Sequence, residues 1–290
     1  MPTSERSSDS SNIARAAGIN ALGNVGSRVL GLVRESVIAS IFGASGATSA
    51  FDAISSVPKM VYELLVGGML SAALVPVLSE YATDERKGEL DRILSILLTL
   101  TGAVMIGVVI LLEAGAAWVA PLLVGGFDAD LLRTATHLTQ IIVPSILIYG
   151  LSGMLQAYHY ARQEFTYPAM GAPAHNLGVI VAVILLAGKL DIYSLSVAIL
   201  VAATTQLLVQ LPGLRRTRLQ LNFDWRHPAV RRILKLYAPV VLSLVISNVG
   251  VIIDRNLASR TVHEAITWMN KATFLIQLPQ GLVSMAISLA

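Results

Sequence analysis

Residues 93–112 read ILSILLTLTGAVMIGVVILL, a run of twenty residues without one Asp, Glu, Lys or Arg. A helix of this length, rising about 1.5 Å per residue, crosses the hydrocarbon core of a bilayer, which is about 30 Å thick. The segments at 169–187 and 195–211 also lack these four residue types. The sequence therefore predicts helical membrane spans, because lipid offers no hydrogen-bond partner to an open backbone.

The composition agrees with a lipid environment. Of the 290 residues, 54% are hydrophobic and only 13% are charged, whereas soluble proteins carry about 25% charged residues. This difference excludes a soluble globular protein of this length. The chain has no cysteine, which excludes disulfides, thiolate metal sites and cysteine nucleophiles.

Eight segments are apolar enough, or nearly so, to be spans, and they predict an all-α, polytopic membrane helix bundle. The segments are residues 13–42, 48–81, 93–124, 131–157, 168–187, 192–214, 233–258 and 265–290. Residues 1–12 are Ser-rich and polar, and we expect them to form a disordered tail. The sequence stops inside an apolar stretch, so we expect it to be part of a longer protein.

The basic residues of the loops predict the orientation of the chain. With a cytoplasmic N-terminus, thirteen lie on the inner side, namely Arg6, Arg15, Arg86, Lys87, Arg92, Arg162, Arg215, Arg216, Arg218, Arg226, Arg231, Arg232 and Lys235. Three lie on the outer side, namely Arg133, Lys189 and Arg260. This bias follows the positive-inside rule and accounts for the net charge of +3 without a nucleic-acid partner.

The densest basic stretch is the loop at residues 215–232. It contains the aromatic residues Phe223 and Trp225 between its arginines. Such a segment can lie along the lipid headgroups as an interfacial loop. The alternative is an ordinary cytoplasmic loop that obeys the charge rule.

Four of the eight segments carry charged and polar residues at helical spacing. Such residues are unfavourable in lipid, so we expect them to face water or partners. At about 100° per residue, they fall on one side of each helix. They are Asn24, Arg28, Arg34 and Glu35 in the first helix, Asp52, Lys59 and Glu63 in the second, Asp254 and Arg255 in the seventh, and Asn270, Lys271 and Gln277 in the eighth. The sequence thus predicts a hydrated cavity, with the third, fifth and sixth helices as an apolar scaffold behind it.

Several of these groups also have a purely structural interpretation. Lys59 and Glu63 are four residues apart on a helix, close enough for an ion pair. Asp254 is adjacent to Arg255, and these two opposite charges could likewise neutralise each other and serve only the structure. Interhelical hydrogen bonds are the alternative for the amides Asn24, Asn270 and Gln277.

The two arginines of the first helix are the main candidates for binding an anion. Arg28 and Arg34 have only Glu35 as a charged neighbour on their helix. The sequence contains no Gly-rich phosphate loop after a strand, no H-E-x-x-H and no G-x-S-x-G. We therefore expect passage of a cargo rather than catalysis, with no cofactor and no metal.

Four groups of residues follow one another along nearly the whole chain in a characteristic order. They are SRVLGLVRE at 27–35 with IFGA at 41–44, GMLSAALVPVLSEY at 68–81, IDRNLAS at 253–259 and LPQGLV at 278–283. This set resembles the MurJ (MviN) lipid II flippases of the multidrug/oligosaccharidyl-lipid/polysaccharide exporter superfamily. The first and second strings are the more specific ones.

The resemblance implies a two-lobed transporter of about fourteen helices that works by alternating access. Residues 13–214 would be the first lobe, and residues 233–290 the first two helices of the second. The implied cargo is an undecaprenyl-pyrophosphate-linked sugar or sugar–peptide, carried across a bacterial inner membrane by a monomer in contact with membrane lipids. The arginines thought to engage the pyrophosphate correspond to Arg28 and Arg34, assisted by Lys59, Arg255 and Lys271.

The sequence departs from the family pattern at the second and eighth helices. Where the family reads Pro-Asn-x-x-Arg-Arg, this chain has PKMVYE at residues 58–63, and Gly67 replaces an acidic residue. Phe274 stands where the family has an arginine. Lipid II is the expected cargo. The alternatives are another lipid-linked glycan, a cation-coupled drug or polysaccharide exporter, an enzyme acting on polyprenyl phosphates, and a membrane scaffold.

Overall fold

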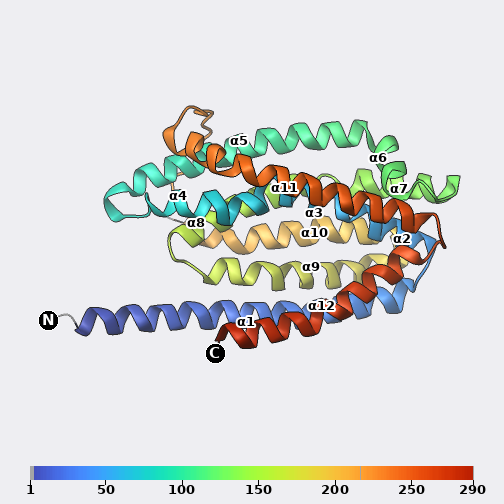
Figure 1. Cartoon of the computed structure of the whole chain (residues 1–290), viewed down its shortest axis with the longest axis horizontal. Helices are drawn as coiled ribbons and strands as arrows, with labels where there is room; N and C mark the ends of the chain where they lie inside the picture. The colour runs from blue at the N-terminus through green and yellow to red at the C-terminus, as the bar shows by residue number, and fades with distance from the viewer. Residues whose placement is uncertain (1–2, 216, 290) are drawn as a thin grey trace.

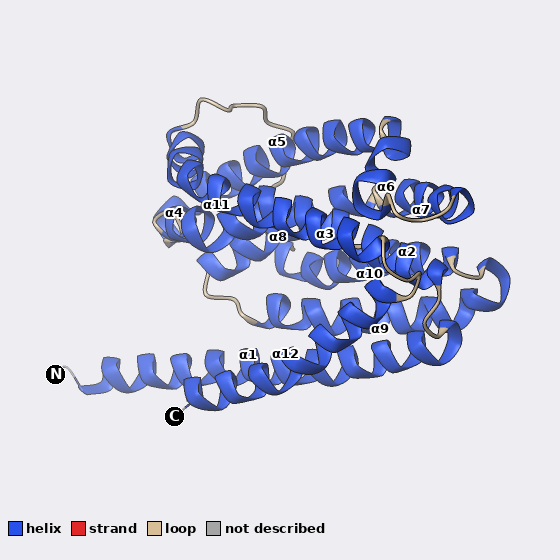
Figure 2. Ribbon diagram, turned by 45° about the vertical axis from the view of Figure 1, so that its right-hand side comes forward, coloured by secondary structure: helices blue, strands red, loops and turns tan. Residues whose placement is uncertain are grey.

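The computed structural model describes residues 3–215 and 217–289, which fold into helices joined by loops without any strand (Figures 1 and 2). The α-helices are α1 (Thr3–Phe42), α2 (Gly46–Ile54), α3 (Ser56–Tyr62), α4 (Val75–Ser79), α5 (Lys87–Ala114), α6 (Ala116–Val124), α7 (Ala129–Ile142), α8 (Ser145–Ala161), α9 (Thr166–Leu190), α10 (Tyr193–Gln210), α11 (Pro228–Ser259) and α12 (Ala265–Leu289). Shorter turns are the π-helices η1 (Glu63–Gly67) and η2 (Leu70–Leu74) and the 3₁₀-helices η3 (Asp84–Arg86) and η4 (Leu211–Leu214). The expectation of an all-α membrane bundle is confirmed.

Five helical stretches in the described part of the chain are long and apolar enough to cross a membrane. They are Lys87–Ala114, Ala129–Ala161, Thr166–Leu190, Tyr193–Leu214 and Pro228–Ser259. The other three expected spans are α1, the broken stretch from α2 to α4, and α12, which carry charged residues in mid-helix. These charges lower their hydropathy, and their place as membrane spans stays a prediction.

Helix α1 begins at Thr3 and therefore includes residues 3–12, which the sequence predicted to be a disordered tail. Residues 1–2 lie outside the described part. A polar segment can continue an existing helix, because extension adds one hydrogen bond per residue without a new nucleation step. Serine composition alone therefore does not place the start of this helix.

Helix ends coincide with residues that suit them. Ser45 caps α2, where its hydroxyl oxygen accepts the Thr48 N–H at 3.1 Å, and Asp128 caps α7, where its carboxylate accepts the Leu131 N–H at 2.9 Å. Gly115 separates α5 from α6, and Pro144 separates α7 from α8. These breaks turn two of the long apolar segments into helix pairs with a bend between them.

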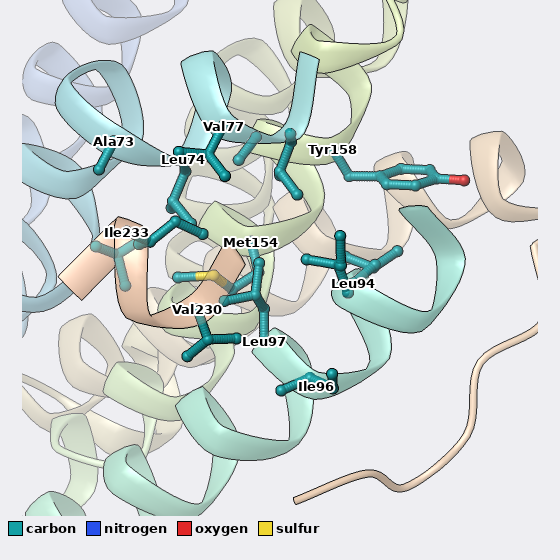
Figure 3. Close-up of a cluster of buried hydrophobic side chains, with 14 of the residues drawn as sticks. Ala73, Leu74, Val77, Leu94, Ile96, Leu97, Met154, Tyr158, Val230 and Ile233 are labelled. Carbon is teal, nitrogen blue, oxygen red and sulfur yellow. The ribbon is translucent and has the colours of Figure 1, made fainter. Parts of the chain in front are cut away.

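Two hydrophobic clusters hold the bundle together at opposite ends. The end that contains the N-terminus of α1 is called the near end, and the end where α1 passes into α2 is called the far end (Figure 1). The near-end cluster joins α4, α5, α8 and the start of α11 through residues such as Leu74, Val77, Leu94, Met154 and Ile233 (Figure 3). The far-end cluster joins α2, α6, α7 and parts of α9 and α10 through residues such as Ile54, Leu123, Leu138, Val183 and Leu195.

Helices α9 and α10 approach closely at Gly178. A methyl group added to Gly178 would lie 2.9 Å from the Cα of Ala202, which is a backbone atom and cannot move aside alone. We expect Gly178→Val to lower the unfolding free energy of the purified protein by about 1–3 kcal/mol through overpacking. The lowered melting midpoint is measured in detergent. Gly188→Val on the same helix is the control, because none of the described atoms that could obstruct a side chain lies within 4 Å of it. Equal midpoints for the two variants would contradict the prediction.

Candidate functional site

A cavity of about 770 Å³ lies between α1, the stretch from α2 to η1, α8, α9, α10, α11 and α12. Most of the predicted polar residues of the first, second, seventh and eighth spans line it. The polar and charged lining includes Ser27, Arg28, Arg34, Glu35, Asp52, Lys59, Glu63, Tyr149, His175, Asn176, Gln206, Arg255, Asn270 and Gln277. The expected polar cavity is therefore present in the structure.

Arg34 is held in place by two neighbours on the cavity wall. Its Nη1 donates to Asn176 Oδ1 at 2.9 Å, and its Nη2 lies 2.8 Å from Glu35 Oε1. Asn176 in turn donates through its Nδ2 to the carbonyl oxygen of Ser27 at 2.9 Å. These bonds fix α1 against α9 and orient the Arg34 guanidinium, which keeps 26% of its side chain exposed.

Arg28 and Lys59 line the same cavity with their charges open. Both side chains are exposed, and in the described part of the chain neither takes part in an ion pair. A cation that has no carboxylate beside it keeps its full attraction for an incoming anion. These two residues therefore offer the most available positive charge on the wall.

Glu35 connects α1 to α12. Its carboxylate accepts from Arg34 on its own helix and from the ammonium group of Lys271 on α12. Lys271 itself is not among the described residues that line the cavity. Lys271 thus reaches the cavity wall through Glu35, and its role in binding the cargo stays a prediction.

Three further contacts join the helices at the far end. Ser49 and Thr267 bring their hydroxyl groups within 3.1 Å, and both side chains are buried. The Asn256 side chain donates to the carbonyl oxygen of Leu122 at 3.1 Å, and the Gly126 N–H donates to Ser259 Oγ at 3.0 Å. Together with the Glu35–Lys271 pair, these contacts bring α11 and α12 against α2 and α6 beside the cavity.

The predicted Lys59–Glu63 ion pair is not formed. The backbone between the two residues is α-helical, since the Glu63 N–H donates to the carbonyl oxygen of Lys59, and the π-helix η1 begins only at Glu63. The Glu63 carboxylate instead lies over Gly67, where a methyl group would come within 2.5 Å of Oε2. Gly67 therefore makes room for this position of the carboxylate.

Two predicted cavity residues lie elsewhere. Asp254 is exposed and Asn24 is exposed, and neither is among the described residues of the cavity wall. Asp254 precedes Arg255 by one residue, so it is turned by about 100° away from the face that Arg255 presents. Asn24 shares the face of Arg28 but lies about 6 Å closer to the near end.

Asp52 and Arg255 each bring to the cavity wall a buried polar atom that lacks a hydrogen-bond partner in the described part of the chain. Asp52 Oδ2 and Arg255 Nη1 are buried and have no hydrogen-bond partner in the described part of the chain. Buried polar atoms of this kind need water or a ligand. No group of three His, Asp or Glu side chains that could hold a metal occurs among the described residues.

Helices α8, α9 and α10 contribute polar groups that the sequence interpretation missed. The hydroxyl of Tyr149 lies 2.7 Å from His175 Nε2, and both residues line the cavity with Asn176 and Gln206. The expectation that the fifth and sixth spans form only an apolar scaffold is therefore wrong. The sequence did contain a sign of this, since His175 and Asn176 are adjacent polar residues in an otherwise apolar span.

A sequence profile described as Lipid II flippase MurJ matches residues 38–290. The chain belongs to the MurJ lipid II flippase family. The lipid II flippase MurJ of Burkholderia cenocepacia is 31% identical over 271 residues, which cover 90% of this chain and 52% of that protein. The probable lipid II flippase MurJ of Buchnera aphidicola is 29% identical and has the same coverage. The chain thus spans about half the length of the curated relatives it matches.

Solved structures support the same fold. A lipid II flippase MurJ in an inward closed conformation matches with a TM-score of 0.76 and 23% identity, over 91% of this chain and 55% of that one. An outward-facing MATE transporter of the MOP superfamily matches with a TM-score of 0.65 and 13% identity, over 81% and 52% of the two chains. The fold is therefore that of the MurJ and MATE transporters.

Three of the departures from the MurJ pattern fall on the cavity wall. Tyr62 and Glu63, which replace the arginine pair of the second helix, both line the cavity, as does Phe274. The positive charge of this wall is consequently concentrated on α1, on Lys59 and on Arg255. Among these residues, Arg28 and Arg34 match the MurJ pattern of the first helix directly.

Proposed function

We propose that the full-length protein moves lipid II from the inner to the outer leaflet of a bacterial cell membrane. Family membership supports this function. The observation that carries the proposal is that Arg28, Arg34, Lys59 and Arg255 surround one cavity of about 770 Å³. A pyrophosphate is anionic at neutral pH, and the planar fork of arginine binds phosphate oxygens in pairs.

The roles of the basic residues follow from their surroundings. Arg28 and Lys59 have open charges and attract the pyrophosphate as it enters. Arg34 is already oriented by Glu35 and Asn176, so little rotamer freedom is lost when it binds. Arg255 has a buried nitrogen without a partner in the described structure, which a phosphate oxygen would satisfy.

The size of the cavity fits the head of the cargo rather than the whole molecule. Pockets of about 300–1,000 Å³ hold ligands of drug size. The pyrophosphate and the first sugar would occupy the cavity, while the polyprenyl tail stays among lipid acyl chains. The protein acts as a transporter and leaves the bonds of its cargo unchanged.

The distribution of loop charges supports a cytoplasmic position for the N-terminus and the near end. The far end is then the outer side of the membrane. The Glu35–Lys271 and Ser49–Thr267 contacts must separate before the cargo leaves outward. This requirement fits alternating access by a monomer, to which the membrane potential can contribute about 2.3 kcal/mol per charge for each 100 mV.

Native mass spectrometry of the full-length protein tests the cargo. We expect the purified protein to carry a polyprenyl-pyrophosphate glycan whose mass gives the sugar and peptide. We call Arg28 and Arg34 the anion clamp. A variant with both Arg28→Ala and Arg34→Ala should lose this adduct, because the two guanidinium groups that bind the pyrophosphate are removed. The variant with Arg133→Ala is the control, since Arg133 is exposed and paired with Asp130 outside the cavity. Retention of the adduct by the double variant, or an adduct without phosphate, would contradict the proposal.

A further inference from the structure

The loop between α10 and α11 is bound along helix α5, a contact that its amino-acid composition does not predict. An extended stretch lies along the first turns of α5, and three side chains of α5 accept its backbone amides. The bonds join Arg218 N–H to Asp91 at 3.3 Å, Gln220 N–H to Ser95 at 3.2 Å and Asn222 N–H to Thr99 at 3.1 Å. Four residues of a helix rise about 6.0 Å, and two residues of extended chain rise about 6.6 Å, so the two repeats match.

The chain then turns back and is held a second time. The Trp225 N–H donates to the carbonyl oxygen of Phe223 at 2.7 Å, and Asp224 forms an ion pair with Arg92 of α5 at 3.2 Å. We call residues 217–227 the α5 strap. It is the long loop beside α5 at the near end (orange in Figure 1, also seen in Figure 2).

The α5 strap presents one apolar face. Because successive side chains of an extended chain point to opposite sides, alternate residues share a face. Leu219, Leu221 and Phe223 are 45%, 89% and 63% exposed, and Trp225 after them is 56% exposed. The residues between them, whose amides bind α5, carry polar side chains. Large apolar side chains exposed at every second position mark a surface that binds an apolar partner.

The charges around this face point to a lipid surface. Arg215, Arg218 and Arg226 are exposed, and the single acid of the α5 strap, Asp224, is already paired with Arg92. The guanidinium of Arg226 lies 5.2 Å from the ring centre of Trp225. Basic residues next to aromatic ones are typical of segments that lie at the surface of anionic membranes.

A second cavity lies under the α5 strap. It has a volume of about 280 Å³ and is lined by Ser95, Leu98, Thr99, Leu219, Gln220 and Leu221. Apolar side chains and hydroxyl groups thus meet at the boundary between the strap and a helix that crosses the membrane. This mixture matches the region where headgroups pass into acyl chains.

We propose that the α5 strap docks on the leaflet of the bilayer at the near end. Leu219, Leu221 and Phe223 enter the upper part of the acyl chains, while Arg218 and Arg226 bind the phosphates of anionic phospholipids. The backbone follows α5 from Asp91 to Thr99, where this helix passes from the headgroups into the acyl chains, and three of its amides are satisfied there by side chains of α5. This interaction depends on membrane insertion and not on the identity of the cargo.

Spin labels in the full-length protein test the docking. The 290 residues contain no cysteine. Leu219→Cys, Gln220→Cys and Leu221→Cys therefore each introduce a single labelling site among these residues. The probe is a vesicle of phosphatidylethanolamine and phosphatidylglycerol. We expect the ratio of collisions with oxygen to collisions with an aqueous nickel chelate to be several-fold higher at 219 and 221 than at 220. Glu85→Cys in the neighbouring loop gives the value for an aqueous position.

The result that overturns the proposal is an aqueous value at all three strap positions, which would leave the apolar face for a protein partner. All three side chains are exposed, so their replacement leaves the core packing intact. A second measurement tests the charge. Arg218→Gln with Arg226→Gln should reduce the oxygen preference at 221 in anionic vesicles to its level in phosphatidylcholine vesicles. An unchanged preference would exclude the anionic headgroups as the partner.

Discussion

Replacement of Arg28 by alanine should abolish growth of a bacterial strain that depends on the full-length protein as its lipid II flippase. Arg28 lines the cavity, is exposed, and has no ion-pair partner within the described residues. Its charge is therefore available to the cargo rather than used to hold the bundle. The measurement is colony formation after depletion of the resident flippase, with membrane insertion checked by immunoblot.

The size of this effect follows from what the arginine does. A charge-assisted hydrogen bond contributes about 1.5–3 kcal/mol, and 1.4 kcal/mol corresponds to a factor of ten in binding. If Arg28 binds phosphate oxygens in the proposed bidentate way, we expect its loss to lower the affinity of the cavity for cargo by roughly one to two orders of magnitude. Arg28→Lys should restore growth only in part, since an ammonium group lacks the fork.

Arg133→Ala is the matched control for this experiment. Arg133 lies on α7, is 75% exposed, and pairs with Asp130 at 2.5 Å away from the cavity. Its loss should leave growth unchanged, because exposed pairs contribute little to stability. Normal growth of the Arg28→Ala strain would remove Arg28 from the anion clamp.

Replacement of Glu35 by alanine should open the far end of the bundle. Glu35 is the carboxylate between Arg34 and Lys271, so its removal leaves two cations facing each other across α1 and α12. Unsatisfied charged groups of this kind cost about 1–3 kcal/mol, enough to raise the open population roughly tenfold. A cysteine at the buried position Ser49 should then react faster with a maleimide that cannot cross the membrane.

The charge-balanced variant makes this prediction specific. Glu35→Ala combined with Lys271→Ala removes the repulsion and should return labelling at position 49 toward its original rate. Asp130→Ala serves as the control, because Asp130 forms its ion pair outside the cavity. Equal labelling of the single and double variants would show that the Glu35–Lys271 pair does not hold the far end.

The helical pattern predicted which residues share a face but not the depth at which each one lies. The first-span stripe correctly placed Arg28, Arg34 and Glu35 on the cavity wall. Asn24 has the same angular position but lies beyond the wall toward the near end. Angular position follows from 3.6 residues per turn, whereas depth depends on which other helices surround that turn, and only the packed structure supplies these.

Two further differences come from backbone geometry and from polar pairs in apolar spans. The spacing of Lys59 and Glu63 suits an α-helix, and the backbone between them is α-helical, but the Glu63 carboxylate lies over Gly67 of the π-helix η1 instead. In this helix the carbonyl oxygen of Leu64 accepts the hydroxyl of Tyr237 from α11. This contact joins residues 173 positions apart, and no local rule predicts it. The contact between His175 and Tyr149, which both line the cavity, also joins residues that are distant in the sequence.

Helix α11 runs from one end of the bundle to the other and is held at both ends. Residues Ala229, Val230, Ile233 and Tyr237 of α11 belong to the near-end cluster, whereas the later turns of α11 are largely exposed. Only Trp225, Arg226 and His227 separate the Asp224 ion pair from the start of this helix. The first turns of α11 are thus rigidly joined to the preceding spans. The contacts of α11 with that cluster continue past Pro239 to Val240, Val241 and Leu244, while its last turns are bonded to Leu122 and Gly126. A rearrangement of this helix must therefore release one of its two ends, and Pro239, which offers no amide, is where the helix bends most easily.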